Sequence, residues 1–532
     1  MNATVFLGAP ISLNDLEQVA MHGKSVSVTA ESRVKVHRSR SGIEAICARG
    51  DESPPVYGVN TGFGAMSETR VSAANLRALQ RNLVRSHSTG VGPNLAVEHV
   101  RGIMLLRAHV LSLGISGVRA EVLDLLVEML NRGVCPRIPA QGSVGASGDL
   151  APLAHLALAM IGEGEASVVD AKKKGATSQP FVPGADALRS VGLAPIVLEA
   201  KEGLALINGT QYMAALGTLA LLQAERLVDI ADIAGAMSLE ALKGTSRPFD
   251  DRLHVARPHP GQSSTARNLR VLLAESEIAE SHRQCGKVQD AYSLRCMPQV
   301  HGATRDALTW VRGVLEREVN SVTDNPSVFI DDLGNAEIIS GGNFHGQPLA
   351  LALDLAAMAV AELANISERR VEQLVNPMLS TGLTPFLAPP GKENEGLHSG
   401  FMIAQVTSAS LVAENKILCH PASVDSIPSS AGKEDHVSMG SISARKLLSV
   451  VANVRNALAI ELMVAAAGVD QRAPLKASRG VSAAHRAVRA GVAAYEGDRP
   501  LYGDIEAIAA MIENGAIVRE IEADLGAIIS RN

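Results

Sequence analysis

The chain has 532 residues, of which 46% are hydrophobic, enough for a large buried core and for two or three domains. Its 49 basic and 55 acidic residues give a net charge of -6 with no basic stripe, which argues against a nucleic-acid or anionic-membrane surface. Five cysteines at irregular spacing, with no C-x-x-C pair, predict buried reduced thiols rather than a disulfide framework.

Helical periodicity dominates the chain. Apolar residues recur at three- and four-residue spacing over Ala73–Ser86, Glu98–Ser112, Arg119–Asn131, Gln211–Ala241, Pro348–Leu374, Gly400–Leu418 and Ser441–Ala467. Strand signals are short, and two pairs of them each predict a small hairpin: Val168-Val169 with Pro180–Val182 around a Lys-rich turn, and Val328–Ile330 with Ala336–Ile339. The expected fold class is therefore mainly α.

Two of the predicted helices are apolar over more than one face, at residues 348–364 and 448–468. Such helices must be buried in a bundle or between subunits, so we expect a long-helix bundle and an oligomer. A boundary near residue 200 separates residues 1–200, a mixed and loop-rich N-terminal part, from residues 201–532, the long-helix bundle and C-terminal helices. Residues 175–184 are expected to form a surface excursion. No leader pattern and no run of roughly 18 apolar residues stands out, which predicts a cytoplasmic protein.

The most informative segment is a glycine-rich loop, residues 142–150, which contains Ala146, Ser147 and Gly148 in succession. If the amide nitrogen of Gly148 attacks the carbonyl carbon of Ala146 and two waters leave, the second from Ser147, a 4-methylideneimidazole-5-one (MIO) ring forms. The methylidene of this ring accepts electron pairs, which no ordinary side chain does well. Gly148 has no Cβ to block the approach, and a fold can hold strained backbone at a functional site.

The tripeptide alone leaves other interpretations open. Gly145 permits strained dihedrals and Asp149 can help to move protons, but a flexible loop before a helix that begins near Leu150 fits the same letters. A nucleophile elbow has the pattern G-x-S-x-G, which fails here because position 149 is Asp. Other blocks of the chain decide between these alternatives.

Six blocks, in order and over nearly the whole chain, together resemble the MIO-dependent aromatic amino acid ammonia-lyase and aminomutase family: Tyr57–Gly64, Gly142–Leu156, Asn208–Thr210, Gln289–Arg295, Gly342–Gly346 and Glu434–Met439. The resemblance is strongest to the members of this family that act on histidine. It implies a carbon–nitrogen lyase with the ammonia-lyase and fumarase-like superfold, and MIO formed autocatalytically from Ala146, Ser147 and Gly148. It also implies a homotetramer in which each active site draws on three chains.

The resemblance implies roles for individual residues, each beside an ordinary structural alternative. Tyr57 matches the catalytic tyrosine that takes the substrate β-proton as general base, where a core or surface tyrosine is the alternative. Arg295 matches the residue that pairs bidentately with the substrate carboxylate, where the alternative is a surface salt bridge. Tyr292, three residues earlier on an expected helical turn, would face the same pocket as a second catalytic tyrosine.

The remaining matched residues concern the cofactor and the walls of the pocket. Asn208 and Gln289 resemble the amides that hydrogen-bond the cofactor ring oxygen and the substrate, and a structural amide is the alternative for both. Phe344 would form an apolar wall beside the cofactor or simply belong to the core. The chain has no H-E-x-x-H or paired Cys and His spacing, and its glycines lack the context of a nucleotide site, so neither a metal nor a nucleotide is expected.

Two positions bear on the substrate. His87 occupies a Ser-His pair where phenylalanine lyases usually carry apolar residues and tyrosine lyases His-Leu, and it can hydrogen-bond an imidazole. Glu434 stands where the aromatic lyases and aminomutases usually have Gln, and its carboxylate can accept an imidazole N–H, whereas a phenyl ring would leave it unpaired. We therefore expect conversion of L-histidine to trans-urocanate and ammonia, with Glu434 among the catalytic residues.

Two rival functions stay open. The first is a tyrosine or phenylalanine ammonia-lyase, or a 2,3-aminomutase, on the same fold, and Glu434 is the residue that discriminates against it. The second is a non-catalytic helical scaffold, against which the complete reactive set from Tyr57 to Arg295 argues.

Overall fold

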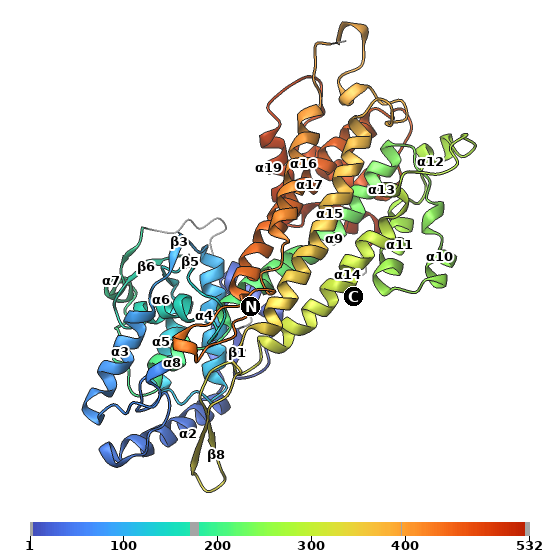
Figure 1. Cartoon of the computed structure of the whole chain (residues 1–532). Helices are drawn as coiled ribbons and strands as arrows, with labels where there is room; N and C mark the ends of the chain where they lie inside the picture. Colours follow the sequence, from blue (N-terminus) through green and yellow to red (C-terminus); the bar gives the residue numbers. More distant parts are fainter. Residues whose placement is uncertain (1–3, 171–179, 395, 527–532) are drawn as a thin grey trace. The chain divides into compact units, whose positions relative to one another are not determined.

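The structure is a computed structural model that describes residues 4–170, 180–394 and 396–526. It contains two compact units, whose elements are labelled in Figure 1. The first unit comprises Met1–Leu219, Arg312–Asp354 and Pro421–Arg445, and the second comprises Ala220–Val311, Leu355–His420 and Lys446–Asn532. The boundary expected near residue 200 stays a prediction about the domains of the chain.

The helices expected from periodicity all form, with bounds close to those predicted. They are α3 (Leu76–His87), α4 (Val97–Ser112), α5 (Ala120–Asn131), α9 (Gln211–Ala241), α15 (Gln347–Val375), α16 (Met402–Leu418) and α17 (Gly440–Asp470). Residues Ala73–Asn75 form a 3-10 turn, so α3 begins three residues later than predicted. The mainly α fold class is confirmed.

Apart from the helix expected to begin near Leu150, the remaining helices were not predicted from periodicity, and they include one of 22 residues, Met297–Glu318. Helix α1 (Leu13–His22) begins at a capping box made by Ser12 and Asp15 and ends at Gly23, whose φ is 65°. The other helices are α2 (Ala30–Cys47), α6 (Leu150–Met160), α7 (Gly184–Ser190), α8 (Glu202–Ile207), α10 (Asp251–Ala256), α11 (Pro260–Leu272), α12 (Glu277–Ser281), α13 (Tyr292–Arg295), α14 (Met297–Glu318), α18 (Arg479–Gly491), α19 (Tyr502–Glu513) and α20 (Ala516–Leu525). Helix α6 begins at Leu150, as predicted.

The sheets are small and lie in the first unit. Strands β8 (Ser327–Ile330) and β9 (Ala336–Ile339) pair antiparallel, which confirms one predicted hairpin. Strands β6 (Glu165–Val168) and β7 (Val182–Pro183) also pair antiparallel, and β4 (Val134–Pro136) adds an unpredicted third strand on the other edge of β6. The Lys-rich turn between β6 and β7, and most of the predicted surface excursion, lie outside the described residues. Two further pairs, β1 (Val5–Leu7) with β2 (Val26–Val28) and β3 (Val91–Asn94) with β5 (Pro139–Gln141), were not predicted.

The cysteines are free, as expected, but they are not all buried. Only Cys135 is buried, Cys285 is exposed, and the other three are intermediate. The expectation of five buried thiols is therefore wrong, because Cys285 lies in a polar segment between α12 and α13 that packs little apolar surface.

Helices α15 and α17 are long and apolar enough to cross a membrane by length and composition. Two thirds of the most apolar window of each is buried inside the structure. They are therefore core helices of a soluble protein, which fits the sequence pattern of helices that are apolar on more than one face.

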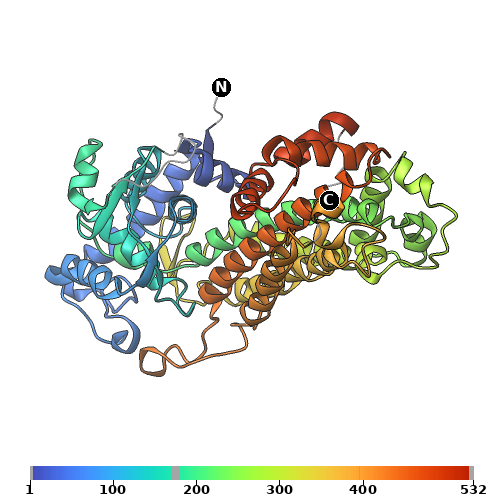
Figure 2. The ribbon, with the colours of Figure 1, turned by 90° about the horizontal axis from the view of Figure 1, so that it is seen from above.

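In the second unit, segments of four long helices lie side by side and share buried polar contacts (Figures 1 and 2). Ser238 of α9 donates to Glu461 of α17 at 2.6 Å, and Arg370 of α15 pairs with the same carboxylate at 2.5 Å. His301 of α14 contacts Asp232 of α9 at 2.8 Å. These polar pairs, buried among apolar side chains, tie the four helices together.

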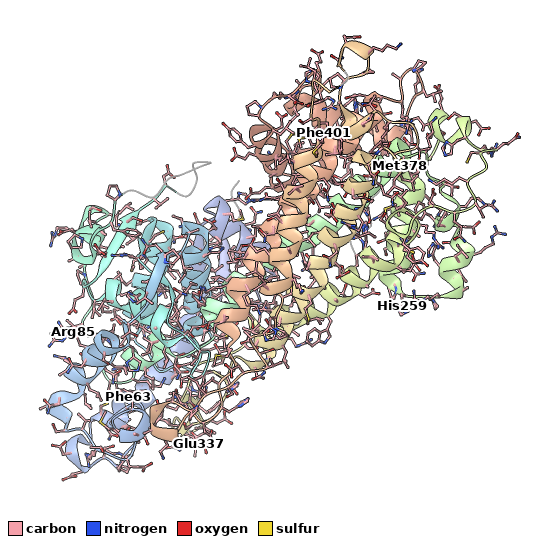
Figure 3. All side chains as sticks on the ribbon, turned by 45° about the horizontal axis from the view of Figure 1, so that its top comes forward. Phe63, Arg85, His259, Glu337, Met378 and Phe401 are labelled. Atoms are coloured by element: carbon pink, nitrogen blue, oxygen red, sulfur yellow. The ribbon has the colours of Figure 1, made fainter. Side chains whose placement is uncertain are left out.

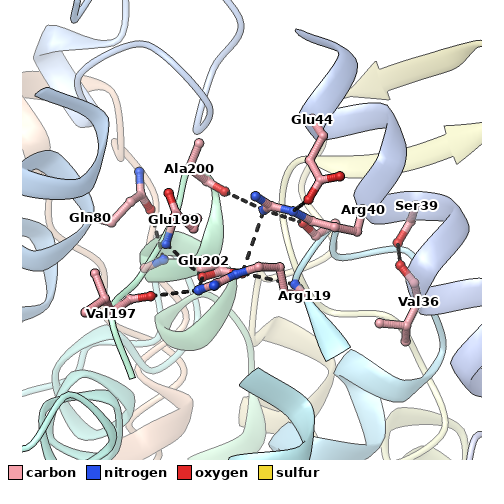
Figure 4. Close-up of polar contacts among 12 residues, drawn as sticks. Val36, Ser39, Arg40, Glu44, Gln80, Arg119, Val197, Glu199, Ala200 and Glu202 are labelled. Carbon is pink, nitrogen blue, oxygen red and sulfur yellow. Dashed lines mark hydrogen bonds and ion pairs between the residues drawn. The ribbon is translucent and has the colours of Figure 1, made fainter. Parts of the chain in front are cut away.

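In the first unit, a buried carboxylate anchors the segment that leads to Asn208 (Figure 4). Glu202, at the start of α8, is fully buried, and Arg119 donates to it from both Nε and Nη2 at 2.8 Å. The side chain of Gln80 accepts a backbone N–H of the same first turn at 2.9 Å, which satisfies a donor that has no partner within the helix. Helix α8 is thus held at its start, and Asn208 follows its last residue.

The buried carboxylate predicts a large cost of removal. Glu202→Ala should lower the free energy of unfolding by about 3 kcal/mol or more, because the donors from Arg119 and the Glu199 N–H lose the fully buried carboxylate that accepts from them. Urea unfolding of the purified protein, compared with the wild type, measures this loss.

A matched control is Glu163→Ala, which removes an ion pair of the same geometry from the surface. Arg85, labelled in Figure 3, donates to both oxygens of Glu163 at 2.7 Å, and both side chains reach solvent. The expected loss is below about 1 kcal/mol. Equal losses for the two variants would contradict the anchoring role of Glu202.

Candidate active site

The loop that carries Ala146, Ser147 and Gly148 connects β5 to α6 in the first unit. Gly145 and Gly148 have φ of 66° and 70°, a left-handed backbone that side chains disfavour. A Cβ on Gly148 would overlap the backbone of Gly209, so only glycine fits at this position. The sequence expectation of a strained glycine loop is met by this geometry.

Two backbone segments hold the loop. On one side, the N–H of Asp149 donates to the Gly209 carbonyl at 2.7 Å. On the other side, the N–H of Met439 donates to the Val144 carbonyl at 2.8 Å, and the hydroxyl of Ser438 donates to a further loop carbonyl at 2.9 Å. The loop therefore lies between the segment after α8 and the segment before α17.

Glu434 lies directly against the predicted cofactor-forming serine. The Ser147 hydroxyl donates to Oε1 of Glu434 at 2.5 Å. The Ser429 hydroxyl donates to Oε2 at 2.5 Å, and the Ser429 N–H donates to the Glu434 backbone carbonyl at 2.7 Å. Each carboxylate oxygen thus has a fixed donor, so the orientation of Glu434 toward Ser147 is well defined.

Tyr57 lies on the loop before α3 and faces the same carboxylate. Its ring packs edge-on against Phe63, with 6.3 Å between the ring centroids and an interplanar angle of 78°. Burial raises the pKa of the Tyr57 hydroxyl, the charge of Glu434 raises it further, and the backbone N–H of Gly64 acts in the opposite direction. The hydroxyl is therefore protonated in the free protein at neutral pH.

His87 is the last residue of α3, and the charge of Glu434 also acts on its pKa. Its Nδ1 lies 2.9 Å from the Leu83 carbonyl, which makes Nδ1 the donor and leaves Nε2 as an acceptor. Burial lowers the pKa of the imidazole, while the hydrogen bond and the Glu434 carboxylate oppose that shift. A neutral His87 with a free acceptor nitrogen suits an N–H donor on a substrate.

Asn208 lies behind the cofactor-forming loop. Its backbone carbonyl accepts from Nη1 of Arg107 at 2.5 Å. The side-chain amide is buried, and Oδ1 has no partner among the described residues. A buried amide without its partners costs free energy, so this position suits a polar ligand atom. A flip of the amide exchanges its oxygen and its nitrogen. The hydrogen bonds formed with the ligand therefore decide which of the two atoms faces it.

Asp149 is a buried acid beside the same loop. It accepts from the Met213 N–H at 3.0 Å and contacts the Ser143 hydroxyl at 3.3 Å. Burial outweighs these hydrogen bonds and raises the pKa of the carboxyl to about 7. Asp149 can therefore take up and release a proton near neutral pH, which fits its expected part in moving protons.

Phe344 lies in the turn before α15 and is half-buried. The next residue, His345, stacks on His436 with 5.6 Å between the ring centroids, and its Nε2 contacts the His436 carbonyl at 3.2 Å. The Phe344 turn therefore lies beside the segment that carries Glu434.

The other three predicted residues belong to the second unit. Gln289 and Tyr292 are exposed, Tyr292 to 70%. Tyr292 and Arg295 lie at opposite ends of α13, where the guanidinium carbon of Arg295 is 4.5 Å from the centre of the Tyr292 ring. Nε of Arg295 is buried without a partner among the described residues. The helical turn expected between these two residues is confirmed.

The structure thus brings Tyr57, His87, Ser147 and Glu434 together in the first unit. Sequence reasoning missed two residues that contact predicted site residues: Ser429, which donates to Glu434, and Arg107, which donates to the Asn208 carbonyl. Arg107 had a visible signal, since it is a charged residue in the middle of a predicted helix, whereas Ser429 lies in a loop with no pattern to mark it.

Comparisons with known proteins show the family to which the chain belongs. The family described as aromatic amino acid lyase matches residues 11–490. Histidine ammonia-lyase from Sorangium cellulosum (strain So ce56) is 66% identical over 524 residues, which cover 98% of this chain and 99% of that protein. Among solved structures, histidine ammonia-lyase from Trypanosoma cruzi has a TM-score of 0.88 and 42% identity, covering 100% of this chain and 98% of that one. Tyrosine aminomutase from Streptomyces globisporus has a TM-score of 0.89 and 39% identity, covering 98% and 99%.

The long-helix fold and the glycine loop with its facing carboxylate define an enzyme class that builds its electrophile from its own backbone. The chain belongs to the aromatic amino acid lyase family. That family depends on MIO. The residues present fit this cofactor, because the strained loop holds Ser147 toward Glu434, Gly148 admits no Cβ, and Oδ1 of the buried Asn208 amide has no partner among the described residues.

The raised pKa of Asp149 predicts a pH-dependent stability. Because the pKa of this carboxyl is about 7 in the folded chain and about 3.9 in an unfolded one, the folded state binds the proton more tightly, and stability falls as pH rises through that window. Asp149→Asn removes the titration. Relative to wild type, its free energy of unfolding should rise by about 2–3 kcal/mol between pH 5 and pH 8.

Asp331→Asn is the matched control for urea unfolding at the two pH values. Hydrogen bonds from Asn335 lower the pKa of Asp331, so its titration ends below pH 5 and its difference from wild type should stay constant. A change in cyclisation would shift the Asp149→Asn values at both pH values alike. Parallel curves for wild type and Asp149→Asn would contradict the raised pKa.

Proposed function

We propose that this chain converts L-histidine to trans-urocanate and ammonia, using MIO formed from Ala146, Ser147 and Gly148. The observation that carries the proposal is the 2.5 Å hydrogen bond from Ser147 to Glu434. This hydrogen bond supports a role for the Glu434 carboxylate beside the residue from which the electrophile forms. Tyr57 and His87 face the same carboxylate.

Glu434 is the residue that favours histidine as the substrate. Formation of the cofactor removes the Ser147 oxygen as water, and with it the donor that Oε1 of Glu434 has in this structure. An imidazole N–H can replace that donor, whereas a phenyl ring would leave the carboxylate oxygen unpaired. His87, with Nε2 as acceptor, offers a second polar contact to the imidazole.

The other site residues of the first unit have separate roles in the proposed reaction. MIO supplies an electrophile for the substrate amine, which no side chain of the chain provides. Asn208 holds the ring by its otherwise unpartnered amide, and Phe344 forms an apolar wall. Tyr57 takes the β-proton as general base. Because burial and Glu434 both raise the pKa of Tyr57, the deprotonated form that acts as base is reached only at a higher pH than for a free tyrosine.

The carboxylate of the substrate needs a cation, and Arg295 is the residue we assign to it. A guanidinium fork binds a carboxylate through two parallel hydrogen bonds, and Nε of Arg295 has no partner among the described residues. Tyr292, which stacks on Arg295, and the exposed amide of Gln289 complete this part of the pocket. We assign these three residues to a neighbouring chain of a homotetramer with shared active sites.

Exposed apolar side chains support an oligomer. Leu351 and Met358 of α15 are 50% and 41% exposed, and Ile403 and Val406 of α16 are 64% and 52% exposed. Apolar side chains exposed together on long helices are typical of subunit interfaces. The five free thiols, one of them exposed, support a reducing compartment and hence a cytoplasmic enzyme.

Ser147→Ala tests the origin of the cofactor. The variant should fold but lose nearly all deamination, and its mass should be lower than the sequence mass by no more than one water. The wild-type chain should be lighter by two waters, because only Ser147 can supply the methylidene. Intact-mass spectrometry and a urocanate assay measure both properties.

Ser143→Ala is the control from the same loop. Its hydroxyl contacts Asp149 at 3.3 Å but lies outside the cyclising tripeptide, so this variant should still lose two waters. A Ser147→Ala chain that deaminates histidine at the wild-type rate would overturn the cofactor assignment.

Glu434→Gln tests the substrate assignment. It keeps the shape of the side chain and removes the charge, so activity on histidine should fall about 10-fold or more, the effect of one charge-assisted hydrogen bond. Combined replacement of Ser86 and His87 by His-Leu or Phe-Leu should further raise activity on tyrosine or phenylalanine relative to histidine. Rates of urocanate, coumarate and cinnamate formation measure the shift.

The control is Asp435→Asn, which removes the same charge from the adjacent exposed residue. Its activity on histidine should stay near that of the wild type. If Glu434→Gln and Asp435→Asn behave alike, the carboxylate of Glu434 does not recognise the imidazole.

A further inference from the structure

Arg107 is a fully buried guanidinium on α4 that the proposed mechanism does not use. Its Nη1 donates to the backbone carbonyl of Asn208 at 2.5 Å. Nε and Nη2 have no hydrogen-bond partner among the described residues. The one hydrogen bond of this charged group therefore goes to a single peptide carbonyl, and most of its donor capacity has no partner among the described residues.

The charges around Arg107 do not compensate its burial. The carboxylate that acts on it is Asp324, and Asp324 is already paired with the fully buried Lys201 at 3.1 Å. Two buried cations thus share one carboxylate. Burial lowers the pKa of Arg107 to about 10, so the group stays charged at neutral pH. Because an incompletely paired buried charge costs free energy, stability alone does not account for this arrangement.

The peptide held by Arg107 forms the wall behind the cyclising loop. A Cβ on Gly209 would lie 3.0 Å from Nη1 of Arg107, which places the guanidinium directly against this peptide. On its other side, Gly209 touches Gly148 so closely that a Cβ there would overlap the Gly209 backbone. The Gly209 carbonyl also accepts the Asp149 N–H at 2.7 Å. One layer of backbone therefore separates the guanidinium from the atoms that cyclise.

We propose that Arg107 is a positioning residue for cofactor formation: by fixing the Asn208-Gly209 peptide, it holds the amide nitrogen of Gly148 toward the carbonyl carbon of Ala146. The inference rests on the proposed function, because it concerns formation of the same cofactor. Arg107 keeps its proton throughout and acts only through the peptide that it binds.

Formation of the ring, the step that Arg107 assists, releases two molecules of water. The Gly148 nitrogen bonds to the Ala146 carbonyl carbon, and the Ala146 oxygen leaves as water with the amide hydrogens of Gly148 and Ser147. The Ser147 Oγ then leaves as the second water with its own hydrogen and the Cα hydrogen of the same residue. No oxidant, reductant or further reactant is needed.

Arg101 provides a matched control on the same helix. It is also buried, and it donates to backbone carbonyls, to Val19 from Nε and Nη2 at 3.2 and 2.9 Å and to Leu130 from Nη1 at 2.9 Å, with the Cys135 side chain as a further partner. Burial lowers its pKa as it does for Arg107. Among the described hydrogen bonds, none joins Val19 or Leu130 to the cyclising loop, so the loss of Arg101 should affect stability alone.

The test follows maturation directly, by cell-free synthesis of the full chain and intact-mass spectrometry at successive times. Wild type, Arg107→Met and Arg101→Met are compared on the soluble fraction, whose folding is checked by circular dichroism. Arg107→Met should slow the loss of two waters about 10-fold or more relative to Arg101→Met, the effect of one charge-assisted hydrogen bond. Arg107→Lys should mature at an intermediate rate, because an ammonium can still donate to the Asn208 carbonyl.

The outcomes separate this inference from the proposed function. Equal rates of water loss for Arg107→Met and Arg101→Met, with a wild type that loses both waters, would overturn the role of Arg107 alone. If Arg107→Met is insoluble, the comparison of Arg107→Lys with Arg101→Lys decides in the same way. A wild-type chain of full sequence mass would overturn the cofactor and this inference together.

Discussion

The close approach of two backbone segments is the constraint on which the rest of the site depends. Gly148 lies against Gly209 with no room for a side chain at either contact point, and a 2.7 Å hydrogen bond from Asp149 to the Gly209 carbonyl locks the approach. Helix α8 brings Gly209 there, because the ion pair of Arg119 with the buried Glu202 fixes its first turn. A polar network at the start of α8 thus supports the geometry of the loop.

A single carboxylate organises the side chains around that loop. Glu434 accepts from Ser147 and Ser429 at 2.5 Å, and its charge raises the pKa of Tyr57 and opposes the burial that lowers the pKa of His87. In the proposed function, the same group therefore orients the precursor of the electrophile, raises the pKa of the base and presents an acceptor to the substrate. An amide at this position would keep the shape but lose the charge on which two of these effects rest.

Local pattern and spacing in the sequence were enough to predict the long helices α9, α15 and α17, the β8 and β9 hairpin and a glycine-rich loop before α6, but not the 22-residue helix α14. Two supports were not predicted from the sequence. Ser429 lies close to Glu434 in the sequence, but in a turn that no periodic pattern marks. Arg107 contacts Asn208 across about a hundred residues of sequence, and such a contact depends on tertiary packing, which no local window encodes. The error about Cys285 has the same origin, because the exposure of a cysteine depends on what packs over its segment.

The central claim is that the chain is a lyase whose pocket selects an imidazole. The most direct measurement is a spectrophotometric assay of the purified wild-type protein with L-histidine, L-tyrosine and L-phenylalanine side by side at equal concentration. The account predicts that urocanate forms from histidine much faster than coumarate or cinnamate forms from the other two. Faster formation of coumarate, cinnamate or a β-amino acid would contradict it.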